Sequence, residues 1–78
     1  MHTVSTYEIT WRAYNSHFKV ADTGHITIRT DGDDADPRVR STAQSNADIW
    51  LRKTEPAYAK AHGTVRDIRY VGSIDEED

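Results

Sequence analysis

Apolar and polar residues alternate along two stretches of the first thirty positions. A period of two, with β-branched and aromatic residues on the apolar side, is typical of half-buried strands. The first stretch covers residues 4–14, and its apolar side carries Tyr7, Ile9, Trp11 and Ala13. The second stretch covers residues 25–30, where Ile26 and Ile28 share one side. The pattern therefore predicts two strands.

Turn-forming residues surround the second of these strands. Asn15 and Ser16 favour a turn, and Phe18 and Val20 either extend a hairpin or lie in its loop. We expect the two strands to pair antiparallel. Residues 31–37 are polar, charged and turn-forming, which predicts a connecting loop.

A helical period follows this loop. Apolar residues recur at helical spacing through residue 53, and they are Val39, Ala43, Ala47, Trp50 and Leu51. Pro37 suits the first helical position with Asp36 as the cap, and Ser41 is the alternative cap if the helix begins later. Pro56 lacks the backbone donor and clashes with the preceding turn, so the helix should end or kink near Thr54.

The rest of the chain predicts a second short helix and a last strand. Thr54 is the expected N-cap of this helix, Ala57, Tyr58 and Ala61 form its inner face, and Gly63 ends it. Residues 64–71 form the strand. Val65 and Ile68 fall on opposite faces under strict alternation, so a bulge or a choice of register is needed. Gly72 closes the strand.

The element order is β-β-α-(α)-β. It predicts a single two-layer α+β domain over residues 1–74, followed by an acidic C-terminal tail at residues 75–78. About three antiparallel strands should form the sheet, with one kinked or two-part helix on one face. A chain of 78 residues can build only one small core.

Charge divides the chain into three blocks. Residues 38–69 carry seven basic and three acidic residues, a net of +4. Residues 1–37 hold six acidic and three basic residues, a net of −3, and residues 75–78 add −4. Segregated charge controls the encounter with partners more than it controls the fold.

The residues for common catalytic and metal sites are not arranged as such sites require. The chain has no cysteine, its four histidines are isolated, and no serine lies in a nucleophile-elbow context. The aspartates in the 31–36 loop do not match the EF-hand spacing. We therefore expect a protein that is not an enzyme and needs no cofactor. No hydrophobic run indicates a signal peptide or a membrane span, which favours the cytoplasm.

A local stretch adds to this picture, a helix end that continues through His-Gly-Thr-Val into the last strand. It reads Ala61-His62-Gly63-Thr64-Val65-x-x-Ile68. With its element order, size and concentrated charge, the chain resembles the small phage and mobile-element proteins that block host defence, notably anti-CRISPR proteins against type I systems. The stretch is similar to a segment in one such family.

The resemblance implies a non-enzymatic inhibitor in the host cytosol. It would dock on the RNA-guided surveillance complex, a ribonucleoprotein, and keep target DNA from the guide, acting as a monomer or weak homodimer. Two routes are open, through the acidic loop or tail or through the basic surface. The candidate partner-binding residues are Arg38, Arg40, Arg52, Lys53, Arg66, Arg69, Asp31, Asp33 and Asp34.

The alternative is a small nucleic-acid-binding or regulatory module. In this reading the basic block at 38–69 contacts phosphates directly, with Tyr58 or Trp50 stacking on bases. The same residues also suit the solvated face of an amphipathic helix. Direct DNA binding is not expected, because the whole chain carries a net charge of −3.

Overall fold

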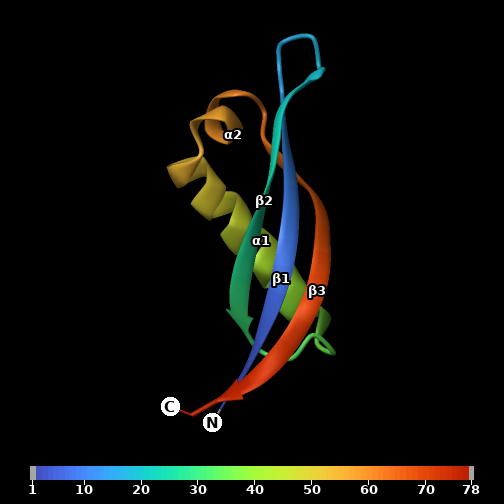
Figure 1. Cartoon of the computed structure of the whole chain (residues 1–78), viewed down its shortest axis with the longest axis vertical. Helices are drawn as coiled ribbons and strands as arrows, with labels where there is room; N and C mark the ends of the chain where they lie inside the picture. Colours follow the sequence, from blue (N-terminus) through green and yellow to red (C-terminus); the bar gives the residue numbers. More distant parts are fainter. Residues whose placement is uncertain (1, 78) are drawn as a thin grey trace.

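A computed structural model describes residues 2–77 and has the expected α+β architecture. Its elements, in chain order, are β1 (His2–Tyr14), β2 (Val20–Asp31), α1 (Pro37–Thr54), α2 (Pro56–Lys60) and β3 (Thr64–Glu76). The strands form one antiparallel sheet in the order β2-β1-β3. Helix α1 crosses behind this sheet in Figure 1, so the other face of the sheet is uncovered. The predicted fold class is confirmed.

The core lies between the inner face of β1 and one side of the helices. The four inward residues predicted for β1 are all buried. Tyr7 and Ile9 pack with Val39, Ala43 and Ala47, while Trp11 and Ala13 pack with Leu51 and Tyr58. The apolar residues that alternate in β1 therefore pack against the apolar residues that recur every four positions in α1, across one interface.

The N-terminus of α1 follows the prediction. Asp36 is the N-cap, and its side chain accepts a hydrogen bond from the backbone amide of Arg38 at 3.0 Å. Pro37 occupies the first turn, where its missing amide hydrogen costs nothing.

The junction between the helices corrects one prediction. Thr54 does not cap α2, because it is the last residue of α1 and its hydroxyl donates to the carbonyl oxygen of Trp50 at 2.8 Å. The amide of Glu55 still donates to the carbonyl oxygen of Leu51, and Glu55 is the single residue between the end of α1 and Pro56, the first residue of α2. Gly63 follows the end of α2, as expected.

Both outer strands are longer than predicted. Strand β2 begins at Val20, and β3 continues past Gly72 to Glu76. Asp75 and Glu76 pair with Thr3 and His2 of β1, so they belong to the sheet and not to a free tail. Asp78 lies outside the described residues.

Two register shifts between β1 and β3 confirm the expected bulge. They leave Arg66 and Val71 of β3 without a directly opposite partner in β1. As a result, Val65 lies opposite Trp11 and Ile68 lies opposite Ile9, on the helix side of the sheet. The bulges resolve the conflict between Val65 and Ile68 in the sequence pattern.

Trp50 is not a core residue, contrary to its place in the helical pattern. Its exposed fraction is 51%, whereas the neighbouring Leu51 is 1% exposed. Successive residues of a helix are turned by about 100°, so Leu51 takes the inward position and Trp50 is turned away. The indole borders a small hollow beside Ile26 and Ile28 of β2.

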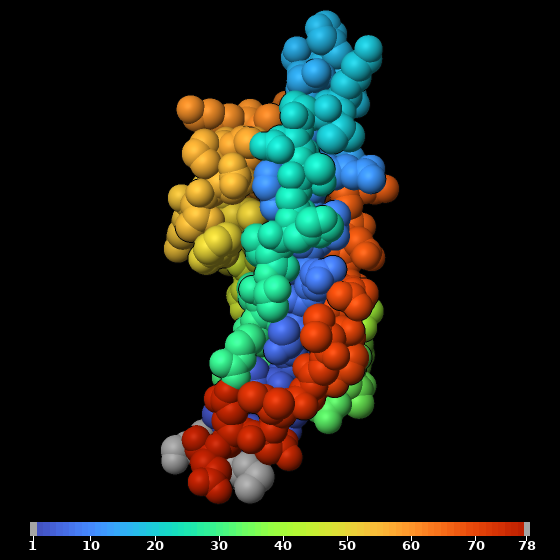
Figure 2. Space-filling model, viewed as in Figure 1, coloured from blue at the N-terminus to red at the C-terminus, as the bar shows by residue number. Residues whose placement is uncertain are grey.

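The molecule is an elongated body of 47 × 20 × 17 Å. The hairpin between β1 and β2 projects at one end, and both termini lie at the other (Figure 2). Within residues 2–77, no helix is both long and apolar enough to cross a membrane.

Candidate functional site

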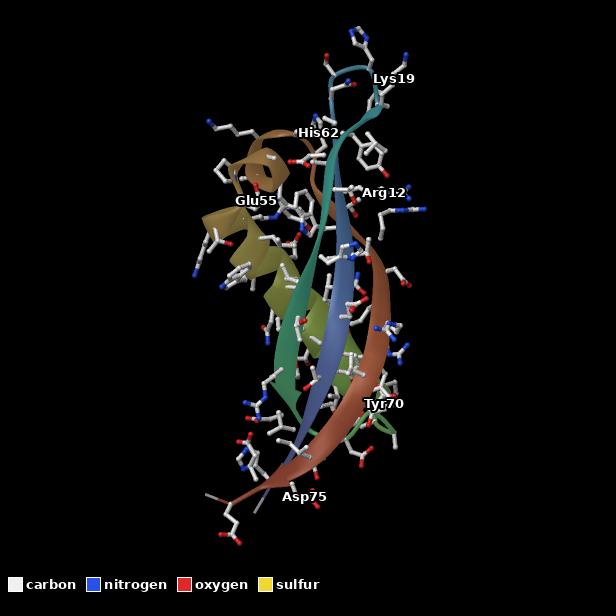
Figure 3. The ribbon with its side chains drawn as sticks, in the orientation of Figure 1. Arg12, Lys19, Glu55, His62, Tyr70 and Asp75 are labelled. Atoms are coloured by element: carbon white, nitrogen blue, oxygen red, sulfur yellow. The ribbon has the colours of Figure 1, made fainter. Side chains whose placement is uncertain are left out.

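The fold brings two acidic segments together at the end of the sheet that carries the termini. Val4 lies between Asp31 of β2 and Ile74 of β3 in the sheet register. We call this region the acidic end and define it by Asp31, Asp33, Asp34, Asp36, Asp75, Glu76 and Glu77. Three arginines lie with these seven acids, Arg29, Arg38 and Arg40, which leaves a net charge of −4. Figure 3 shows Asp75 here, far from Lys19 at the hairpin.

Hydrogen bonds to β1 fix both acidic segments. The amide of Gly32 donates to the carbonyl oxygen of Thr3 at 2.7 Å, and the hydroxyl of Thr3 donates to Oδ1 of Asp75 at 2.9 Å. The ion pair between Arg29 and Glu76 joins the two outer strands on the uncovered face. Both acidic segments are therefore attached to the sheet, one through the backbone of Gly32 and the other through the carboxylates of Asp75 and Glu76.

A buried serine, which the sequence pattern did not single out, completes this support. The hydroxyl of Ser5 donates to the carbonyl oxygen of Gly32 at 2.7 Å, and it lies 2.9 Å from the hydroxyl of Ser73. Since Ser5 has one hydrogen to donate, Ser73 is the donor in their shared bond. Tyr70, 2.6 Å from Ser73, then donates in its turn. This chain of hydroxyls connects β3 to the acidic loop through β1.

Tyr7 attaches the acidic loop to the core. Its hydroxyl donates to Oδ1 of Asp34 at 2.6 Å, and burial together with this carboxylate raises the pKa of Tyr7 to about 12. Arg40 lies 3.4 Å from the same Oδ1 and 5.8 Å from the centre of the Tyr7 ring. Asp34 and Arg40 are thus parts of one tyrosine–aspartate–arginine cluster.

A second cluster of the same composition lies at the other end of α1. The hydroxyl of Tyr58 donates to Oδ1 of Asp48 at 2.5 Å, and Nε of Arg52 donates to Oδ2 of Asp48 at 3.0 Å. Burial and the Asp48 carboxylate raise the pKa of Tyr58 to about 12, while the bond from Tyr58 lowers the pKa of Asp48. The Arg52 guanidinium lies 5.4 Å from the centre of the Tyr58 ring.

Ion pairs occupy four of the six basic candidate residues. Arg40 and Arg52 belong to the two clusters above. Arg38 pairs with Asp36 at 2.9 Å, and Arg69 pairs with Glu8 at 3.2 Å. The basic block is therefore largely neutralised within the chain, and its local net of +4 is not a free positive surface.

The basic candidates are also spread over different parts of the molecule. Arg69 lies opposite Glu8 on the uncovered face of the sheet, whereas Arg52 and Lys53 lie at the end of α1 behind it. Arg66 lies in a bulge of β3. Neither Lys53 nor Arg66 forms an ion pair within the part of the chain that the structure describes. The fold does not combine these residues into one contact surface.

Cations that form no ion pair among residues 2–77 lie toward the end opposite the acidic end. This region, which we call the hairpin end, carries four cations, Arg12 and Lys19 on the hairpin and Lys53 and Lys60 near the C-terminal ends of α1 and α2, against Asp22 and Glu55. Opposite charge at the two ends makes the molecule an electric dipole along its longest axis. The three-block charge pattern of the sequence becomes two charged ends in the fold.

The surface of the described residues has several hollows, one of which lies at the acidic end. An open hollow at the acidic end is lined by His2, Thr3, Asp31, Gly32 and Asp33. Among residues 2–77, no group of three or more histidine, cysteine, aspartate or glutamate side chains is placed to hold a metal ion.

Comparison of the chain with protein-family models, with curated proteins and with solved structures finds no match. The two charged ends are the features of the molecule that bear most directly on its function.

Proposed function

We propose that this chain is a non-enzymatic inhibitor that acts by occupying a surface. Its acidic end docks on the cationic DNA-binding surface of a host ribonucleoprotein, a type I CRISPR surveillance complex, and thereby keeps target DNA from the guide. The observation that carries the proposal is the joining of two separate acidic segments into one supported end with a net charge of −4.

Electrostatic complementarity supports this docking mode. Lysine and arginine side chains that hold DNA phosphates also attract carboxylates on a rigid support. Because the opposite charges lie along the long axis, the field of such a complex turns the acidic end toward its surface during the encounter. Ser5 and Tyr7 hold the acidic loop in place, so little conformational entropy is lost on binding.

The ion pairs of the basic block weigh against the alternative of direct nucleic-acid binding. Arg38, Arg40, Arg52 and Arg69 each already pair with a carboxylate of the chain, which reduces the positive charge that each guanidinium offers to a phosphate. Of the basic residues without an ion pair among residues 2–77, Arg66 lies apart in a bulge of β3, and the cations of the hairpin end are partly offset by Asp22 and Glu55. Of the two docking routes that the charge pattern allows, the acidic route is the one that the geometry favours.

Binding to a purified type I surveillance complex, with duplex target DNA as competitor, tests the proposal. The unmodified chain should bind, and it should lower DNA binding as its own occupancy rises. The test variant combines Asp31→Lys with Glu77→Lys, since both side chains are exposed at the acidic end. We expect its affinity to fall about tenfold or more.

A matched control combines Glu55→Lys with Asp67→Lys, which changes the net charge equally but away from the acidic end. Its affinity should stay close to that of the unmodified chain. Equal losses for the two variants would mean that only total charge matters, and no binding by the unmodified chain would refute the proposal.

A salt series with duplex DNA alone tests the rival function. The free chain should show no measurable DNA binding. Affinity that falls steeply with salt would support the nucleic-acid-binding module instead.

A further inference from the structure

The turn at the tip of the β1–β2 hairpin is closely hydrogen-bonded. The amide of Asn15 donates to the carbonyl oxygen of Lys19 at 2.9 Å. The amide of Phe18 donates to the carbonyl oxygen of Asn15, also at 2.9 Å. Oδ1 of Asn15 also accepts hydrogen bonds from the amides of His17 at 2.9 Å and Lys19 at 3.1 Å. These four bonds define the backbone of the turn.

Phe18 occupies an unfavourable position in this turn. Its φ is 59°, in the left-handed region that glycine enters at no steric cost and that other residues enter at a cost in free energy. Its side chain gains nothing in return within the fold, because it is 82% exposed. Folding alone therefore favours a glycine here, and the structure holds a large aromatic ring instead.

The surroundings of Phe18 indicate the kind of partner that it fits. Val20 beside it is also exposed, while Lys19 and Arg12 have no ion pair among residues 2–77. The hairpin projects beyond the body of the molecule, so this tip can enter a concave surface (Figure 2). The tip thus combines two exposed apolar side chains with the cation of Lys19, and it is complementary to an apolar pocket with an acidic group at its rim.

We infer that Phe18 is a second anchor, which inserts into an apolar, acidic-rimmed pocket of the protein partner. This inference rests on the proposed function, and it adds a contact at the end of the molecule opposite the acidic end. Buried aromatic anchors carry a large share of the affinity in protein interfaces. A cost in free energy at a turn residue is a feature of segments whose conformation serves binding.

The low positive charge of the hairpin argues against a nucleic acid as the partner that this tip enters. A wedge between DNA bases depends on phosphate contacts from neighbouring cations. The projecting hairpin, residues 12–23, offers only Arg12 and Lys19 as permanent cations, and Asp22 offsets one of them.

Phe18→Gly tests the inference, with the purified type I surveillance complex as the probe. Glycine suits the φ of this position, so the thermal stability of the free variant should be unchanged or higher. Its affinity for the complex should nevertheless fall about thirtyfold, as expected for loss of an aromatic anchor. A variant that keeps or gains thermal stability but loses affinity shows that Phe18 serves docking, because a structural residue would lose both.

Two further variants sharpen the experiment. Val71→Ser removes another exposed apolar side chain, from β3 and away from the hairpin tip, and its affinity should stay within about twofold of the unmodified chain. Lys19→Glu reverses the charge that faces the acidic rim of the pocket, and its affinity should fall.

The possible results distinguish this inference from the proposed function. If the unmodified chain binds and Phe18→Gly binds equally well, the second anchor is refuted while the acidic end stands. If the unmodified chain does not bind, both are refuted. If the unmodified chain binds duplex DNA and Phe18→Gly abolishes that binding, the tip is a nucleic-acid wedge and the inference is wrong.

Discussion

The hydroxyl of Tyr58 in α2 donates a 2.5 Å hydrogen bond to Oδ1 of Asp48 in α1. This bond joins two helices that only Glu55 separates, and it lies beside the buried edge-to-face contact between Tyr58 and Trp11, whose ring centres are 5.8 Å apart. Arg52 neutralises the same carboxylate. The position of α2 therefore depends on one phenol and one carboxylate as well as on apolar packing.

Replacing Tyr58 by phenylalanine should lower the free energy of unfolding by about 1–3 kcal/mol. The ring and its contact with Trp11 remain, but the Asp48 carboxylate loses a hydrogen bond in a partly buried place. Urea denaturation of the two proteins measures the difference. Tyr14→Phe is the control and should change little, because no side-chain hydrogen bond is formed by Tyr14 in the described chain. Equal stability of all three proteins would show that the bond to Asp48 contributes nothing.

Stability should decrease at alkaline pH because both buried tyrosines hold their protons more tightly when folded. The pKa of Tyr7 and that of Tyr58 rise from 10.0 to about 12. A raised pKa contributes stability that is complete below pH 10 and is lost as the pH rises toward 12. Urea denaturation at intervals between pH 9 and 12 measures this loss. The decrease in stability should be smaller in Tyr58→Phe. If this variant lost as much stability between pH 9 and 12 as the unmodified chain does, the raised pKa of Tyr58 would not contribute to the loss.

Most of the fold was predictable because its information is local. Strict alternation located the inner face of β1, and Asp36 with Pro37 marked the start of α1. The extension of β3 to Glu76 was not predictable from local propensity, because residues 73–76 are ordered by pairing with the first residues of β1. Long-range pairing of this kind leaves no signal in a period of two.

The candidate site was predictable only in part. Asp31, Asp33 and Asp34 lie together at one end, as neighbours in the sequence must, but the support that Ser5 and Tyr7 give to this loop was not predicted. The pairing of Arg69 with Glu8 spans 61 positions and exists only because β1 and β3 are neighbours. The role of Phe18 depends on a φ value and on exposure, neither of which a residue type reveals.

Leu51→Ala and Trp50→Ala should have very different effects, although the residues are neighbours with large apolar side chains. Leu51 is buried between β1 and α2, so its truncation should lower the free energy of unfolding by about 2–5 kcal/mol. Trp50 is half exposed, and its truncation should cost about 1 kcal/mol or less. Urea denaturation measures both. Unfolding of Trp50→Ala would restore the core role that the helical spacing predicts.

Gly24→Ala should destabilise the sheet, because Gly24 in β2 lies directly opposite Trp11 in β1. A Cβ atom at position 24 would lie 2.7 Å from the Trp11 indole, which is already packed against Tyr58 and cannot move aside freely. Such overpacking typically lowers the free energy of unfolding by about 1–3 kcal/mol.

Gly72→Ala provides the matched control for this substitution. Gly72 also lies in an outer strand beside β1, but no atom lies within 4 Å of the position of an added Cβ. Its free energy of unfolding should therefore change by about 0.5 kcal/mol or less. Thermal or urea denaturation of both variants measures the contrast. Equal effects at the two glycines would show that the close approach of Trp11 to the β2 backbone does not limit side-chain size there.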